Sequence, residues 1–91
     1  MFIFEWDEAK REVNLAKHGL DFLIVGDLFD GRAMLTEDSP RGEEMRHRSV
    51  CEWRGLIVTV VWTLRDEGRR VISLRRARDV ESQAYRSLFG E

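Results

Sequence analysis

Arginine is the residue type in this sequence that points most directly to chemistry. Of the 15 basic residues only Lys10 and Lys17 are lysines, and the others are arginines. Because the guanidinium group is a rigid fork of donors that matches phosphate geometry, this preference favours contact with a phosphate-bearing polymer. The alternative is that the arginines are solvated surface charges paired with nearby acids, and composition alone does not separate the two interpretations.

The charges are unevenly distributed along the chain. Residues 1–44 carry five basic and eleven acidic residues, a net charge of −6, whereas residues 45–91 carry ten arginines and six acids, a net of +4. The total of −2 argues weakly against nonspecific nucleic-acid binding. The asymmetry nevertheless predicts one basic face, which is where a polyanion would bind.

The sequence lacks the motifs of several common catalytic sites. It has no phosphate-binding glycine loop, nucleophile elbow, cysteine pair for zinc or HExxH helix, and His18 and His47 lack metal-site spacing. We therefore expect no metal, no cofactor and no covalent nucleophile. Cleavage of RNA by its own 2′-hydroxyl fits these limits, because the enzyme then orients the strand, moves two protons and stabilises charge on the phosphorane.

Residues in three regions are candidates for those tasks. The candidates for charge stabilisation are Arg65, Arg75 and Arg76. Alternation along a strand makes Arg75 the better candidate for phosphate contact, with Arg76 reaching over the strand end or pairing with Glu81. The helical set Lys10, Asn14, Lys17 and His18 would line the same groove, with His18 or a nearby Lys or Glu moving protons. The alternatives are a solvated helix face for the lysines and a helix C-cap role for His18.

These residues need a scaffold, and the sequence predicts one domain over residues 1–91 with the element order β-α-α-β-β-β-β-α. The expected strands are 2–6, 33–36, 46–53, 56–64 and 69–76. The expected helices run from an Asp7 N-cap to about Lys17, from Asp21 onward, and from an Asp79 N-cap. Short turns between successive strands favour an antiparallel sheet of about four to five strands with two N-terminal helices and one C-terminal helix packed on it, an α+β fold.

Apolar spacing predicts which side of each element faces the core. The inward-facing helix residues would be Ala9, Val13 and Ala16, then Phe22, Val25, Leu28 and Phe29, and finally Val80, Ala84 and Leu88. A hairpin turn at Asp66-Glu67-Gly68, with Gly68 left-handed, would pair Arg65 with Arg69. The other pairs would be Thr63 with Val71, Val61 with Ser73, and Thr59 with Arg75. One face would then be apolar except at its ends, where Arg70 and Arg76 fall, and the other would hold the polar and cationic residues, including Arg69 and Ser73. We expect this polar face to bind the ligand, and an ordinary solvated sheet face is the alternative.

The compartment can also be inferred. Cys51 has no second cysteine to pair with, the first residues turn acidic without a basic segment, and the longest apolar run, Leu56 to Leu64, has nine residues. These features predict a cytoplasmic protein with no signal peptide and no membrane contact.

A set of short motifs resembles the BrnT family of toxins. In chain order they are Phe4-Glu5-Trp6-Asp7, Lys10, Asn14, Lys17-His18-Gly19, Phe22, Glu44-x-Arg46, Val60 to Arg65, Val71 to Ala77, and Glu81 with Tyr85 one helical turn further on. The likeness covers nearly the whole chain, and the ordered set carries it rather than any single motif.

The resemblance implies a RelE-like ribonuclease toxin of a type II toxin–antitoxin pair, which inhibits translation. It adds Glu44 to the catalytic candidates and places Arg46 and Tyr85 with Lys10, Asn14, Lys17, Arg69 and Ser73 as RNA-binding candidates. The expected partner is a BrnA-like antitoxin in a heterotetramer, with operator DNA contacted only through that antitoxin. The alternatives are a module that only binds its antitoxin and a small nucleic-acid-binding regulator.

Overall fold

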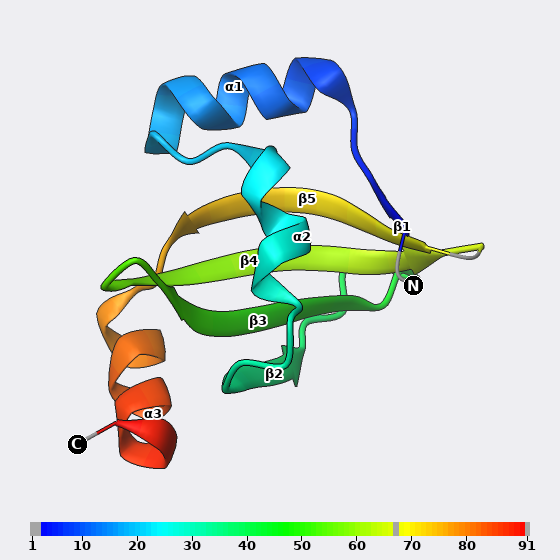
Figure 1. The fold of residues 1–91 in the computed structure, drawn as a ribbon. Coiled ribbons are helices and arrows are strands. Elements are labelled where there is room, and N and C mark those ends of the chain that lie inside the picture. Colours follow the sequence, from blue (N-terminus) through cyan, green and yellow to red (C-terminus); the bar gives the residue numbers. More distant parts are fainter. Residues whose placement is uncertain (1–2, 67, 91) are drawn as a thin grey trace.

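The computed structural model describes residues 3–66 and 68–90 (Figure 1). The strands are β1 (Ile3–Glu5), β2 (Met34–Asp38), β3 (Arg46–Trp53), β4 (Leu56–Arg65) and β5 (Gly68–Arg76). The helices are α1 (Glu8–His18), α2 (Val25–Leu28) and α3 (Asp79–Phe89), with a short 3₁₀ turn, η1 (Phe22–Ile24), before α2. The predicted order of elements and the α+β class are confirmed, although α3 begins at Asp79 and its N-cap is Arg78.

The five strands form one sheet in the order β1-β5-β4-β3-β2. Strands β2 to β5 pair antiparallel with their neighbours, whereas β1 runs parallel to β5, so the sheet is mixed and the expected all-antiparallel sheet is corrected. A parallel neighbour needs a long connection, and nearly the whole chain lies between these two strands. Gly68 permits this contact, because a Cβ there would lie 2.5 Å from the carbonyl oxygen of Ile3.

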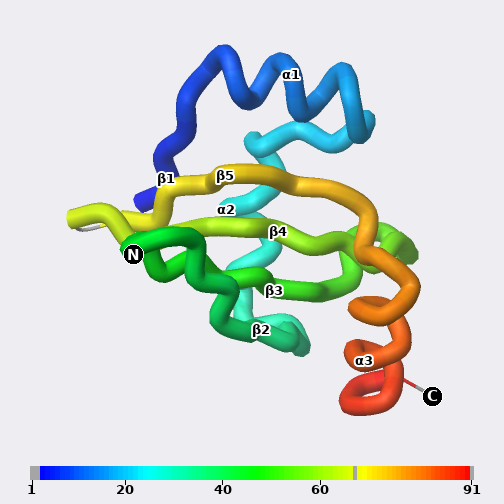
Figure 2. Tube along the Cα trace, turned by 180° about the vertical axis from the view of Figure 1, so that it is seen from behind, coloured from blue at the N-terminus to red at the C-terminus, as the bar shows by residue number. Residues whose placement is uncertain are grey.

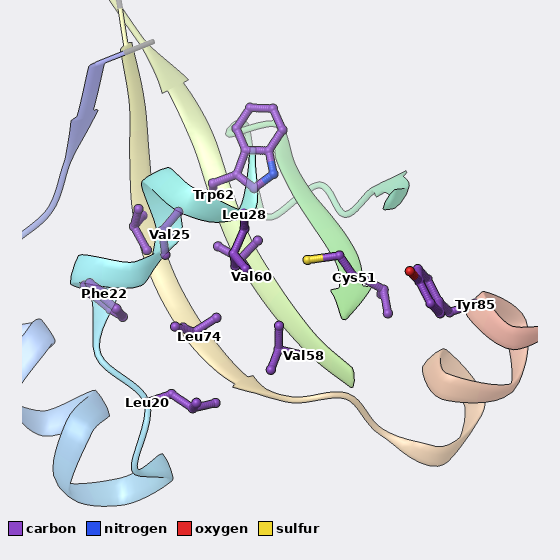
Figure 3. Close-up of a cluster of buried hydrophobic side chains, with 12 residues drawn as sticks. Leu20, Phe22, Val25, Leu28, Cys51, Val58, Val60, Trp62, Leu74 and Tyr85 are labelled. Carbon is purple, nitrogen blue, oxygen red and sulfur yellow. The ribbon is translucent and has the colours of Figure 1, made fainter. Parts of the chain in front are cut away.

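The two faces of the sheet are covered differently. Figure 1 shows α2 lying across one face, and Figure 2, seen from behind, shows the opposite face without it and α3 near one end. We call these the covered face and the open face. Phe22, Val25 and Leu28 are fully buried, as predicted, and pack with β4 and β5 residues such as Val60 and Leu74 (Figure 3). The core therefore lies between η1–α2 and the covered face.

The inward stripes predicted for α1 and α3 are wrong. Val13 is 65% exposed and Val80 is 76% exposed, and the other members of both stripes are also exposed. The buried residues of these helices are instead Asn14, Glu81 and Tyr85. Each has specific hydrogen-bond partners, which allows a polar side chain to be buried where periodicity alone favours an apolar one.

The register of the β4–β5 hairpin contains an irregularity that the sequence analysis missed. The predicted pairs Val61–Ser73 and Thr59–Arg75 are confirmed, but Trp62 pairs with Val71, so Ile72 is an extra residue in β5. This β-bulge shifts every later pair: Arg65 faces Gly68, and the predicted pairs Arg65–Arg69 and Thr63–Val71 are wrong. Of the predicted turn Asp66-Glu67-Gly68, Glu67 lies outside the described residues; of the other two, Asp66 is left-handed, with φ 47°, and Gly68 is not.

Because side chains alternate, one extra residue moves the start of β5 to the opposite face. Arg69 therefore turns to the covered face, where its guanidinium lies 4.4 Å from the ring centre of Phe29 and 4.7 Å from that of Trp62. Arg70 pairs with Thr63 on the open face, in the position that had been expected for Val71, and donates to Glu5 Oε2 at 3.0 Å.

Candidate functional site

The open face carries a groove of about 370 Å³ that we call the arginine groove. Its lining residues are Ser39, Arg41, Arg46, Arg48, Val61, Ile72, Ser73, Arg75 and Arg78. Within residues 3–66 and 68–90, every charged residue that lines it is an arginine. In a chain of net charge −2, this concentration of one sign favours an anion over a cation in the groove.

The sheet register sets the layout of the arginine groove. Arg48 of β3 pairs with Val61 of β4, and Val61 pairs with Ser73 of β5, so these three side chains form one row. Thr59 and Arg75 form the neighbouring row. The bulge at Ile72 lies beside Ser73, in keeping with the tendency of bulges to occur next to functional sites.

Arg75 is held firmly by α3. Its Nη1 donates to Glu81 Oε1 at 2.8 Å and its Nη2 to Oε2 at 3.1 Å, and its side chain is 14% exposed. Arg75 therefore makes the contact with Glu81 that had been considered for Arg76. Arg76 is exposed, and neither it nor Arg65 lines the arginine groove.

Glu81 organises this end of the groove. Besides Arg75, its Oε1 accepts from Thr59 Oγ1 at 3.0 Å and from the Arg78 backbone N–H at 2.8 Å. Burial opposes ionisation of the carboxyl, but the hydrogen bonds from Arg75, Arg78 and Thr59 outweigh it and hold its pKa at about 2. Glu81 is thus ionised at neutral pH and fixes the position of the Arg75 charge.

Glu44 lies at the opposite end of the open face, where it joins two predicted site residues. Its Oε1 accepts from Arg46 Nε at 2.7 Å, and its Oε2 accepts from Arg65 Nη2 at 3.4 Å. The hydrogen bond from Arg46 is the main cause that lowers the pKa of Glu44. Glu44 is therefore ionised and has no proton to donate, which excludes an acid role, while its lowered pKa makes it a weak base.

A second groove of about 330 Å³ lies between α1 and β5, and we call it the helix groove. Its lining residues are Ala9, Lys10, Val13, Asn14, Lys17, His18, Ile72 and Ser73. Ile72 and Ser73 also line the arginine groove, so the two grooves meet at the bulge. The predicted set Lys10, Lys17 and His18 is therefore brought together beside Ser73.

His18 sits in the last turn of α1, partly shielded from water. Burial lowers the pKa of its imidazole, and the charges of Lys17 and Arg75 lower it further. A pKa below the ordinary 6.5 leaves the ring neutral at neutral pH, which is the form that can accept a proton.

Asn14 has a structural role that limits its use as a ligand contact. Its Nδ2 donates to Leu74 O at 2.8 Å and to Leu20 O at 3.1 Å, and its Oδ1 accepts from Leu74 N at 3.2 Å. Both amide hydrogens are occupied and the residue is buried, so this geometry does not support the RNA contact that we expected of it.

Two other RNA-binding candidates lie away from both grooves. Arg69 is on the covered face among aromatic rings, and burial lowers the pKa of its guanidinium. Tyr85 is buried at α3, where its hydroxyl donates to Ala33 O at 3.3 Å and its ring centre lies 5.1 Å from that of Phe89. Neither side chain is placed to touch a ligand in the arginine groove.

The structure also brings in arginines that the sequence analysis did not single out. Arg48 lines the middle of the arginine groove, and Arg41 and Arg78 are exposed at it. The signal for Arg48 was present, because it follows Arg46 by two residues on one strand and must share its face. Arg70 could not be predicted from alternation, because the bulge at Ile72 moves the earlier residues of β5 to the opposite face of the sheet.

The fold and the site together define a small α+β domain with an arginine-lined groove on its open sheet face. The family model for the BrnT ribonuclease toxin of type II toxin–antitoxin systems matches residues 6–81. The match covers most of the 91 residues, and the chain belongs to this family of toxins, whose members act with an antitoxin partner. A comparison with curated proteins gives no match. In the part of the chain that the structure describes, no helix is long and apolar enough to cross a membrane.

Proposed function

We propose that this chain cleaves RNA in the arginine groove by attack of a 2′-hydroxyl on the adjacent phosphate, without a metal, as a RelE-like endoribonuclease. The observation that carries the proposal is the groove itself, in which arginine is the only charged residue type among the described lining residues. Cleavage of RNA in the cytoplasm would inhibit translation. The family match supports the ribonuclease class, and the chemistry at this groove is our proposal.

The proposed roles follow from the positions of the side chains. Lys10, Lys17 and Arg46 bind the RNA backbone, and Ser73 lies where the two grooves meet. Arg75 stabilises negative charge on the phosphorane. Arg65 pairs with Gly68 at the opposite end of the hairpin from Arg75, and Arg76 lies outside the arginine groove, so we do not assign this role to either of them. His18 or Glu44 takes the 2′-hydroxyl proton as the O2′–P bond forms, and the P–O5′ bond breaks as the 5′-oxygen gains a proton.

The proposed partner is a BrnA-like antitoxin that covers the grooves, forms a heterotetramer with the toxin and contacts operator DNA itself. The family description supports an antitoxin partner of this kind. A module that only binds its antitoxin is the second candidate. It is favoured by the ion pairs Arg75–Glu81 and Arg46–Glu44, because these carboxylates already neutralise part of the groove's charge.

The test is incubation of the purified protein with an end-labelled RNA oligonucleotide in a chelator, beside the same oligonucleotide containing 2′-deoxy sugars. We expect cleavage of the RNA only. Arg75→Ala should lose about a hundredfold to a thousandfold in rate, by analogy with the loss of one oxyanion donor. Arg75→Lys should recover little, because a point charge does not replace the planar fork. Intact RNA with folded protein would leave the binding module as the better candidate.

A further inference from the structure

Arg48 differs from Arg46 and Arg75, two other arginines of the groove, in what its guanidinium contacts. Arg46 and Arg75 donate to carboxylates at 2.7 and 2.8 Å, so both are tied to acids of the protein. The nearest carboxylate oxygens to Arg48 are Glu81 Oε2 at 3.7 Å and Glu37 Oε1 at 3.8 Å, both beyond hydrogen-bond distance. Within the described residues, the Arg48 guanidinium therefore forms one ion pair with Glu81 and one with Glu37, and it donates no hydrogen bond.

One of these unused donors is buried. Arg48 Nε has almost no contact with solvent and no hydrogen-bond partner, although the side chain as a whole is 34% exposed. Burying an N–H without an acceptor is costly, and the protein supplies none for this donor. Nε itself is closed to a ligand, but the exposed part of the same guanidinium lines the arginine groove and has donors that no protein acceptor takes.

Ser73 completes the arrangement on the other side of the groove. Ser73 lies in the same cross-strand row as Arg48, and Val61 lies between the two. Because two interstrand spacings separate them, the Cα atoms of Ser73 and Arg48 are about 10 Å apart. Its side chain is half-buried, and its hydroxyl forms no hydrogen bond to any residue that the structure describes. A tetrahedral anion above Val61 would meet donors from both sides.

We infer that Arg48 and Ser73 form a phosphate-binding subsite in the middle of the arginine groove, which takes one phosphodiester of the RNA. Arg41 and Arg78 line the same groove and add charge beside the subsite. Arg75, held by Glu81, contributes a charge at a fixed position, whereas Arg48 contributes hydrogen bonds that no protein group uses. This inference rests on the proposed function, since it names the residues that hold the substrate.

The test measures binding of a 2′-O-methyl RNA oligonucleotide, which cannot be cleaved, over a range of salt concentrations. Arg48→Ala should weaken binding on the order of tenfold and reduce the slope of log Kd against log salt by about 0.7, the value for one phosphate contact on a single strand. Arg48→Lys should keep the slope and lose affinity, because an ammonium does not supply the guanidinium fork. Arg86→Ala on α3 is the matched control, because it removes an exposed arginine outside the groove and should change neither quantity.

Ser73→Ala provides a second variant should Arg48→Ala unfold, and it should weaken binding severalfold while leaving the salt slope unchanged. Binding by folded Arg48→Ala and by Ser73→Ala with the affinity and slope of the unmodified protein would overturn the subsite.

The outcomes also separate the subsite from the proposed ribonuclease mechanism. If both variants bind the oligonucleotide less tightly but the unmodified protein cleaves no RNA, the subsite is supported and the ribonuclease mechanism is rejected. If the unmodified protein cleaves RNA but both variants bind as tightly as it does, the ribonuclease mechanism is supported and the subsite is rejected.

Discussion

Glu81 is the residue on which the charge arrangement of the arginine groove most depends. Its carboxylate accepts hydrogen bonds from Arg75, Thr59 and the Arg78 backbone, and it lies 3.7 Å from Arg48. A carboxylate among arginines reduces the net positive charge of the site. It also fixes the guanidinium of Arg75, and a charge that is already in place needs no reorganisation when a reaction occurs.

Replacing Glu81 by Gln tests this role through stability. The change leaves the partly buried Arg75 without its counter-charge and should cost about 3 kcal/mol of unfolding free energy, at the lower end for a broken buried pair. The folded-state pKa of about 2 lies below the ordinary 4.5, so the unmodified protein should lose stability as pH falls from about 4.5 towards 2. Urea titrations of both proteins between pH 2 and 7 measure this. Glu81→Gln should lose less stability than the unmodified protein over this pH range, while Asp21, Asp30 and Glu44, whose pKa values are also lowered, still contribute a loss. Parallel curves for the two proteins would contradict the assignment.

His18 gives the second prediction at the scale of a residue. Burial, with Lys17 and Arg75, lowers its pKa, so the neutral imidazole should remain available well into the mildly acidic range. If His18 accepts the 2′-hydroxyl proton, the cleavage rate should rise with pH through a pKa below 6.5 and level off near neutrality. His18→Ala should lower the rate about 10²–10⁴-fold and remove the acid limb of the profile.

NMR titration of the His18 ring supplies an independent readout. In Arg75→Ala the imidazole pKa should move upward, because a nearby positive charge has been removed. A pH–rate profile of unchanged shape in His18→Ala would remove His18 from proton transfer and leave Glu44 as the candidate.

At the scale of elements, helix α1 lies along the part of the outer edge of β5 that has no neighbouring strand. β1 covers only Gly68 to Arg70 of that edge, and α1 lies beside the rest (Figure 1). The Asn14 side chain both donates to Leu74 O and accepts from Leu74 N, the two bonds that a neighbouring strand would provide. An exposed sheet edge is a site for unwanted pairing, and Asn14 closes it at this position.

Asn14→Ala should therefore act on stability rather than directly on RNA contact. Leaving the Leu74 N–H and C=O unpaired in a buried position should cost about 1–3 kcal/mol, and hydrogen exchange of the Leu74 amide should accelerate. Lys10→Ala on an exposed face of the same helix is the control and should change stability by no more than about 0.5 kcal/mol. Unchanged stability of Asn14→Ala together with weaker RNA binding would restore the ligand role that the sequence suggested.

The elements that could be predicted from the sequence are those with strong local signals. The Asp7 N-cap and the left-handed Gly19 after α1 mark the ends of that helix, and the β-branched run of β4 marks a strand. Phe22, Val25 and Leu28 faced the core as their spacing indicated. In the site, the helical set had been expected in the same groove as the arginines. Lys17 and His18 instead line the helix groove, which meets the arginine groove at Ser73, and Arg46 and Arg75 share the arginine groove.

The remaining differences arise from contacts between distant segments. No glycine or proline marks the bulge at Ile72, yet that one residue exchanges the faces of Arg69 and Arg70. Burial of Glu81 depends on Arg75 and Thr59, which belong to other elements, so helical periodicity could not reveal it. Arg48 was missed because the motifs of the family resemblance end at Arg46 on that strand.

At the scale of the whole molecule, the two joined grooves form a cationic surface on a chain that is acidic overall. The charged residues that line them are basic or histidine throughout the described chain, whereas the chain as a whole has a net charge of −2. Such a surface would attract cellular RNA whenever it was open. We therefore expect a partner that neutralises the toxin to cover the grooves, and an acidic segment would complement them best.

Val13 and Val80 provide a matched pair of substitutions that locates this partner. Both are exposed helix residues, at 65% and 76%, but Val13 lines the helix groove whereas Val80 lies on α3 outside both grooves. Because neither is buried, Val13→Asp and Val80→Asp should each change folding stability by no more than about 0.5 kcal/mol. If an acidic antitoxin segment covers the grooves, Val13→Asp should weaken its binding on the order of tenfold through like-charge repulsion and loss of an apolar contact, while Val80→Asp should bind normally. Calorimetry with the purified antitoxin measures both affinities. Weakened binding of Val80→Asp alone would place the partner on α3, and the arginine groove would then stay open to RNA in the complex.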